Sequence, residues 1–428
     1  MTHSLWLRSA YGEPRRAPAM PAAAAAPAYV AVNPVLRLTL YLFVFSIPFE
    51  MPRYAIPLEV PTLTASLFLA TTLLNPSAAF RRMPRAVLWF GLYLWVYVAA
   101  WVFLANEHGT ETMRQFLFMV LLIAVLWVVY NLLADPRVLR GVLLAVVISC
   151  VVRAGMQWFG IAATAMDVWT GGQRVTVLGQ NPNLSAIILS VGLVTVLGLQ
   201  ATRARWLPRF ELLSWPLAAA IGFAIIQSGS RGGLLCAAAG MLVFFLHGRT
   251  FWRRLMNAAV GTVAVALLAW GALQSEMMRG RLVESAEAGR YAGRELIYPT
   301  AIQMFSERPL LGWGPIDNQY EIARRIERVQ QQKNPSRDAH NLVLELITTT
   351  GVVGALPFFI GIALCVRGAW RARWGPLGML PLAVLVAVLA GTVTGTWIAS
   401  KVLWFALALA LAAGDHWSAP VSRPEGVR

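Results

Sequence analysis

Long apolar stretches alternate with short polar segments along this 428-residue chain. A helix that crosses a membrane needs about 20 mostly apolar residues, and twelve stretches of roughly this kind are present. They lie at residues 34–49, 57–75, 86–105, 113–134, 138–160, 183–200, 211–228, 231–247, 255–273, 341–366, 375–395 and 397–414. Prolines interrupt the first two stretches, so a kinked or re-entrant pair of helices is the alternative there. The pattern predicts an all-α polytopic membrane protein with about twelve transmembrane helices.

Residues 274–339 form the one long polar stretch between apolar segments. Two parts of it repeat apolar residues at helical spacing: Ile297, Ala301, Met304 and Phe305, then Ile322, Ile326 and Val329. A rigid turn is expected between them, at residues 309–315. We predict amphipathic helices that lie along the membrane surface as a lid; an ordinary subdomain outside the membrane is the alternative.

Composition supports the membrane interpretation. The hydrophobic residues make up 58% of the chain and the charged residues 13%, against about 45–50% and about 25% in soluble domains. The net charge of +16 would suggest nucleic-acid binding in a soluble protein, but the basic residues sit in short clusters between apolar runs. A cytosolic enzyme and a nucleic-acid module are therefore excluded. The three cysteines lie inside apolar runs, without the spacing of a metal site or a disulfide framework.

The arginines predict which side each segment faces, because arginine is enriched in cytoplasmic segments. With the N-terminus inside, the short cytoplasmic segments carry 20 arginines, and the short outer loops hold Arg53, Arg114, Arg174 and Arg231. This predicts a disordered cytoplasmic tail (1–33), transmembrane helices 1–9 (34–273), an outer loop (274–339), helices 10–12 (340–414) and a second cytoplasmic tail (415–428). A cleaved signal peptide is not expected, since the first apolar run starts late.

His340 is the strongest candidate for chemistry. It stands in the run Arg337–Asn341, where the large loop enters a predicted helix. A neutral imidazole there can accept a proton from a hydroxyl, and Asp338 is expected to cap the helix. A capping or interfacial histidine is the alternative, with Asp338, Glu295 and Glu345 as fallback bases.

Arg231 and Arg294 are the candidates for binding an anion. Arg231 lies in the small-residue turn Ser228–Gly233, and Arg294 opens the first amphipathic stripe. Small residues allow close approach to a ligand, and arginine pairs with phosphate oxygens through two N–H groups. The alternatives are a side chain that reaches the membrane interface for Arg231 and a surface salt bridge for Arg294.

Further candidates for binding substrate are Arg153, Arg174, Asn181, Asn183, Asp338 and Asn341. Arg153 falls within a predicted span, where a charge is functional or paired. At least one of Asn181 and Asn183 is expected to cap a helix. Lys401, inside the last span, is expected to pair or to reach the interface. No motif of a metal site or a nucleotide loop is present, so neither a metal nor a cofactor is expected.

Several of these runs together resemble the bacterial O-antigen ligases and polymerases. They are Asn181-Pro182-Asn183, Ser228–Gly232, Gly293–Tyr298, Pro309–Gly314, Ala339-His340-Asn341, Glu345 and Thr350–Gly354. The signature covers residues 181–354, and Tyr298 stands where the family often has Trp.

The resemblance implies a metal-independent, inverting glycosyltransferase of the bacterial inner membrane. Such an enzyme transfers O-antigen polysaccharide from undecaprenyl pyrophosphate to lipid A–core on the periplasmic side and completes the lipopolysaccharide. His340 would be the general base, and Arg231 and Arg294 would bind the pyrophosphate. The implied partners are the two glycolipids and membrane lipid, with no nucleic acid, and the protein is expected to be a monomer.

Other functions remain open from the sequence. An O-antigen polymerase uses the same donor with a second lipid-linked glycan as acceptor, and ligases that modify proteins share the motifs. A secondary transporter would also fit twelve spans. Against a transporter stand the single large outer loop, the lack of an internal repeat and the lack of interrupted segments in matching halves of the sequence.

Overall fold

The computed structural model describes residues 31–50, 59–104, 107–167, 173–202, 210–246, 251–288, 293–330 and 335–418. Most of the two predicted tails lies outside these ranges, so their disorder and their cytoplasmic location stay predictions.

Every one of the twelve apolar stretches contains a helix. These helices are α1 (Pro34–Ser46), α2 (Val60–Thr71), α4 (Arg85–Phe103), α5 (Gly109–Leu132), α6 (Pro136–Trp158), α7 (Pro182–Ala201), α8 (Phe210–Gln227), α9 (Arg231–Val243), α10 (Phe251–Gln274), α14 (Leu342–Arg371), α15 (Leu380–Thr392) and α16 (Lys401–His416). Among the described residues, seven of these helices are long and apolar enough to cross a membrane; α1, α2, α9 and α15 are shorter apolar helices, and α16 has 16 residues. The all-α polytopic fold is therefore confirmed.

Short elements complete the membrane part. A four-residue helix, α3 (Pro76–Ala79), follows α2, and four 3-10 helices extend or link neighbours: η1 (Ile47–Phe49), η2 (Thr72–Leu74), η3 (Phe244–Leu246) and η4 (Ala372–Trp374). The core is built from apolar side chains of the bundle, with α16 buried along almost its whole length.

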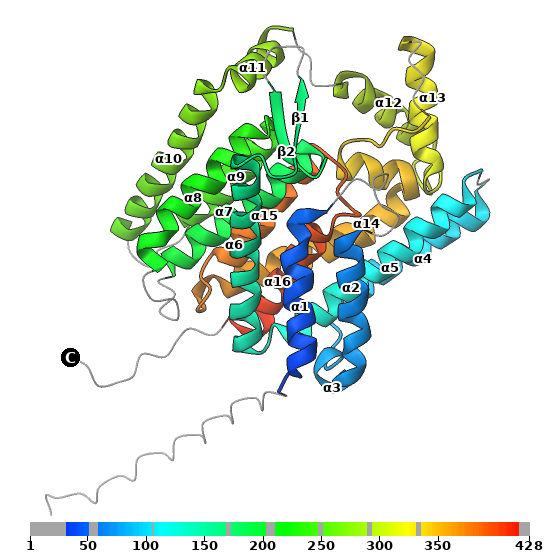
Figure 1. Cartoon of the computed structure of the whole chain (residues 1–428). Coiled ribbons are helices and arrows are strands. Elements are labelled where there is room, and N and C mark those ends of the chain that lie inside the picture. Colours follow the sequence, from blue (N-terminus) through cyan, green and yellow to red (C-terminus); the bar gives the residue numbers. More distant parts are fainter. Residues whose placement is uncertain are drawn as a thin grey trace, which may run out of the picture.

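The elements of residues 274–339 and a short hairpin gather at one end of the bundle (Figure 1). Figure 1 shows a hairpin of β1 (Ala163–Asp167) and β2 (Gln173–Val177) at the same end as α11 (Glu276–Ala288), α12 (Arg294–Glu307) and α13 (Asp317–Gln330). The two apolar stripes form α12 and α13 as predicted, and they share a small core with Ala339. The sequence pattern missed α11 and the hairpin, which pairs antiparallel from Ala163↔Val177 to Asp167↔Gln173.

Polar residues join the helices at the opposite end, where Figure 1 places α3. The Asn131 side chain accepts from the Arg82 amide at 3.0 Å and donates to the Arg82 carbonyl at 2.8 Å. Trp417 Nε1 donates to the carbonyl of Leu133, and Tyr130 bonds Asp415. Residues predicted to be cytoplasmic therefore meet at one end, although the membrane side they face stays a prediction.

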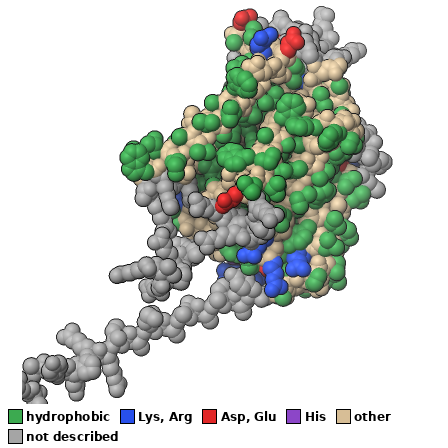
Figure 2. Space-filling model, turned by 60° about the vertical axis from the view of Figure 1, so that its left-hand side comes forward, with side chains coloured by type: hydrophobic (Ala, Val, Ile, Leu, Met, Phe, Trp, Pro, Cys, Tyr) green, Lys and Arg blue, Asp and Glu red, His purple; other side chains and the backbone are tan. Residues whose placement is uncertain are grey.

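An apolar belt covers the surface between these two ends. Figure 2 shows apolar side chains over most of one face, with basic side chains gathered at its lower end. Exposed apolar residues of α8 and α10 include Leu212, Leu213, Trp215, Phe223, Val260, Val263, Leu267 and Trp270. Contiguous exposed apolar surface of this kind suits contact with lipid.

The turn at residues 309–314 packs against α14 where that helix is interrupted. Gly351 has φ 61° and ψ −165°, which breaks the helix. The amides of Trp313 and Gly314 donate to the carbonyls of Thr348 and Thr349 at 2.7 and 3.1 Å, and the amide of Val352 donates to the Pro309 carbonyl at 2.9 Å. Backbone groups left open by the break are thus bonded. This contact fixes the segment between α12 and α13 on α14, whose N-cap Asn341 directly follows His340.

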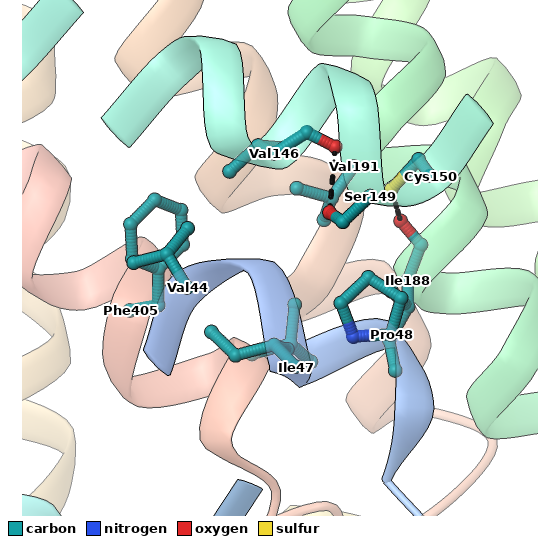
Figure 3. Close-up of a pocket in the computed structure, with 10 residues that line it drawn as sticks. Val44, Ile47, Pro48, Val146, Ser149, Cys150, Ile188, Val191 and Phe405 are labelled. Carbon is teal, nitrogen blue, oxygen red and sulfur yellow. Dashed lines mark hydrogen bonds between the residues drawn. The ribbon is translucent and has the colours of Figure 1, made fainter. Parts of the chain in front are cut away.

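A small apolar cavity lies deeper in the bundle, among α1, α6, α7 and α16. Figure 3 shows its wall, which includes Val44, Ile47, Ile188 and Phe405. Ser149 and Cys150 at its edge bond the carbonyls of Val146 and Ile188. The lining lacks charged groups, so the cavity is a packing feature rather than a candidate site.

Candidate functional site

His340 pairs with Asp338 and stands directly before the N-cap of α14. His340 Nδ1 contacts Asp338 Oδ1, and Thr396 Oγ1 donates to Asp338 Oδ2. The prediction that Asp338 caps the helix is wrong: Asn341 is the N-cap of α14, and its side chain accepts from the amides of Val343 and Leu344. Helix α14 begins after Asn341, and not after Asp338, because His340 has a positive φ of 49°, which is not a helical conformation.

The Asp338–His340 pair suits proton transfer. Burial alone would raise the pKa of Asp338, but its contacts with His340 and Thr396 outweigh burial and hold the pKa below the usual value. The carboxylate is therefore ionised at neutral pH and can accept a hydrogen bond from Nδ1–H, which leaves Nε2 as the basic nitrogen. The His340 side chain is 45% exposed, so a substrate can reach the ring.

Buried polar groups of α13 and α14 hold the backbone beside His340. Glu345 Oε2 accepts from the amide of Ala339 at 2.9 Å. Its other oxygen accepts from Asn318 Nδ2 at 3.1 Å and from Gln319 Nε2 at 2.8 Å. Through these bonds Glu345 positions the backbone beside His340, while its use as a fallback base stays a prediction.

Tyr298 ties α12 to the same turn. Its hydroxyl lies 3.3 Å from the carbonyl of His340 and 2.9 Å from that of Val393. A tyrosine hydroxyl thus bridges two segments of the site at the position where the resemblance suggests Trp.

Residues 393–396, between α15 and α16, connect the parts of the site. Arg294 Nη2 donates to the Thr394 carbonyl at 2.6 Å, and Thr396 bonds Asp338. A Cβ added to Gly232, next to Arg231, would lie only 2.6 Å from Thr394 Oγ1. Arg294 and Asp338, the partner of the predicted base, therefore bond one short segment, and Gly232 next to Arg231 lies close to it. Residues 393–395 were predicted to end the stretch 375–395, so the apolar pattern did not reveal this segment, although the Thr- and Gly-rich run at residues 391–396 was a visible signal.

Arg174, Arg231 and Asn183 meet at the turn before α9. Arg174 Nε donates to the Ser228 carbonyl at 2.9 Å and Arg174 Nη2 to Asn183 Oδ1 at 3.1 Å. Ser230, the N-cap of α9, also donates to Asn183 Oδ1 at 2.9 Å. Arg231, the first residue of α9, donates through Nη1 to the Arg281 carbonyl at 2.8 Å. The positive end of the α9 dipole adds to these charges.

Three other candidates have structural partners. Asn181 caps α7, as predicted for one of the two asparagines. Arg153 is fully buried and donates to the Pro48 carbonyl and, at 2.7 Å, to Ser185, so it joins η1 to α7. Lys401 pairs with Glu50 and Glu59 at 3.0 and 2.7 Å, as expected for a buried charge.

Comparisons with known proteins agree with the motifs. Residues 216–359 match the model of a family described as O-antigen ligase. An O-antigen ligase of Pseudomonas aeruginosa is 29% identical over 217 residues, which cover 50% of this chain and 48% of the relative. The resemblance to the O-antigen ligase family is confirmed. The chain spans about half the length of the curated relative it matches.

The O-antigen ligase match contains only part of the site. Residues 216–359 include Arg231, Arg294, Asp338 and His340. Arg174 on the hairpin and Thr396 before α16 lie outside that segment, yet they bond residues at or beside the site. The geometry therefore adds residues to the site that the family motifs leave out.

Proposed function

We propose that this chain transfers O-antigen polysaccharide from undecaprenyl pyrophosphate to lipid A–core at the periplasmic face of a bacterial inner membrane. The observation that carries this proposal is the arrangement around residues 393–396, where the Asp338–His340 pair and Arg294 bond one segment. A base beside several cations matches a reaction that removes a proton from an acceptor and releases a charged phosphate group.

The proposed reaction is a single displacement. An acceptor sugar hydroxyl attacks the anomeric carbon of the donor, and His340 Nε2 takes the hydroxyl proton. The new C–O bond forms as the bond from the anomeric carbon to the phosphate oxygen breaks, so the electron pair leaves with undecaprenyl pyrophosphate. One displacement inverts the anomeric configuration. Asp338 stabilises the imidazolium that forms, and Arg231 and Arg294 stabilise the leaving group.

The arginines are proposed to bind the pyrophosphate through paired N–H groups, so lysine should replace them poorly. We expect Arg231→Lys and Arg294→Lys each to lower the transfer rate about tenfold or more, a loss of about 1.4 kcal/mol in transition-state stabilisation. Arg279→Lys, which alters an exposed residue of α11, is the matched control. Normal transfer by both single variants, in correctly inserted protein, would contradict this assignment.

The transfer is proposed to need no divalent cation. Among the described residues, no group of three or more His, Cys, Asp or Glu side chains is placed to hold a metal ion, and hard cations require several oxygen ligands. Purified protein supplied with both glycolipids should therefore form product at full rate in EDTA. Loss of activity in EDTA that magnesium or manganese restores would refute the prediction.

A further inference from the structure

Helix α11 packs directly on the turn that carries Arg231. A Cβ added to Gly229 would lie 2.4 Å from Met277 Sδ of α11, and Gly229 has a positive φ of 63°. Arg281 Nη1 donates to the Gly229 carbonyl at 2.9 Å, while Arg231 Nη1 donates to the Arg281 carbonyl at 2.8 Å. Each of the two arginines thus bonds the backbone of the segment that carries the other.

Arg174 lies on the other side of the same turn. Its Cγ would be 3.0 Å from a Cβ on Gly229, and its Nε bonds the Ser228 carbonyl. The turn is therefore flanked by Arg174 from β2 and Arg281 from α11, with Arg231 at its end.

The charges of these arginines act on one another. Burial and the charges of Arg281 and Arg231 lower the pKa of Arg174 to about 10. Burial lowers the pKa of Arg281 as well; Arg231 and Arg294 lower it further, while Glu284 raises it. Guanidinium groups from four elements thus repel one another in a partly buried region. An anion between them would relieve this repulsion.

We propose that Arg281 binds the pyrophosphate of the lipid donor together with Arg231 and Arg294, with Arg174 closing the far side of the turn. This inference rests on the proposed function and adds a residue that the motifs do not include. A pyrophosphate carries more charge than a monophosphate and has oxygens on two phosphorus atoms. Recognition by several arginines from separate elements therefore favours the diphosphate, since each guanidinium presents N–H donors in a fixed plane.

Binding of farnesyl pyrophosphate and farnesyl monophosphate to the purified full-length chain tests this role. The probes carry the diphosphate and the monophosphate on the same short prenyl tail, so their comparison isolates the second phosphate. We expect Arg281→Gln to raise the Kd for farnesyl pyrophosphate about tenfold or more, as for other hydrogen bonds to charged groups, and the Kd for the monophosphate by less. The Arg281 carbonyl that accepts from Arg231 remains in this variant.

Arg279→Gln is the matched control, because it removes the same charge from an exposed position on the same helix; its Kd should stay within about twofold of wild type. Arg231→Gln and Arg294→Gln are the benchmarks. If Arg281→Gln binds as wild type while both benchmarks weaken, the inference is wrong and the proposed function stands. If all three variants bind as wild type, the pyrophosphate site of the proposed function is wrong too.

Equal weakening of both probes by Arg281→Gln would also count against the proposed role of Arg281, because it would indicate a general loss of structure at the turn. If that variant does not fold, Arg281→Lys keeps the charge but loses the planar fork. It should bind farnesyl pyrophosphate more weakly than wild type, and wild-type affinity would overturn the proposal.

Discussion

Replacing His340 with Ala should lower the rate of glycan transfer by about 10²–10⁴, which is the usual contribution of a general base. The reason is geometric: Asp338 engages Nδ1, and the His340 side chain is 45% exposed, so a substrate can reach it. Donor binding should change little, because the arginines that are proposed to hold the pyrophosphate lie on other elements. The measurement is the initial rate of transfer by purified protein, with prenyl pyrophosphate binding determined on the same sample.

Two variants sharpen this experiment. His416→Ala removes an imidazole at the opposite end of the bundle, in the last turn of α16, and should leave transfer intact. Asp338→Asn keeps the shape of the carboxylate but removes its charge, so transfer should fall because the imidazolium loses its partner. Near-normal transfer by His340→Ala would make the histidine structural. A failure caused only by lost donor binding would place His340 with the arginines instead.

Replacing Gly351 with Ala should destabilise the protein by about 3 kcal/mol or more. Its φ and ψ lie in a region that is essentially restricted to glycine. A Cβ there would also lie 2.1 Å from the Leu310 carbonyl oxygen, a backbone atom that has no rotamer by which to move away. The bonds between residues 309–314 and α14 would have to break, which would displace the loop next to His340. Thermal unfolding in detergent and the rate of transfer should both reveal the loss.

Gly155→Ala provides the matched control for the same chemical change. Gly155 lies inside α6, and a Cβ at this position would meet nothing within 4 Å. Alanine is favoured over glycine in a helix by roughly 0.5–1 kcal/mol, so this variant should be neutral or slightly stabilised. If Gly351→Ala melts at the same temperature as Gly155→Ala, the turn does not depend on that glycine.

The fold was largely predictable because membrane helices leave a strong signal. Each of the twelve stretches contains a helix, and apolar stripes at helical spacing correctly placed α12 and α13. The hairpin was missed because β1 is the weakly patterned run Ala-Thr-Ala-Met-Asp, which has little of the β-branched and aromatic character of strands. Helix α11 was missed because its polar sequence shows no clear apolar stripe.

The site was predictable only where a residue type carries the chemistry. His340, Arg231 and Arg294 stand out by residue type and sequence context alone. In the structure Arg294 bonds residues 393–396, as does Asp338, the partner of His340, and Gly232 next to Arg231 lies close to them. Their partners are separated from them by long stretches of sequence: Thr396 bonds Asp338 across 58 residues. Such contacts depend on how α15 and α16 pack, which no local pattern reveals. Asp338 shows most clearly where prediction from sequence fails. A short polar residue before a helix predicts a cap, but the positive φ of His340 delays the start of the helix, so Asn341 is the cap.

Deleting the gene and analysing the cell's glycolipids tests the central claim most directly. If the chain joins a finished polysaccharide to lipid A–core, the deletion strain should accumulate polymer on undecaprenyl pyrophosphate and carry core without O-antigen. The wild-type gene should restore the lipopolysaccharide, and the His340→Ala gene should not. Core that carries a single O-antigen repeat would instead identify a polymerase, and unchanged lipopolysaccharide would contradict the proposed ligase function.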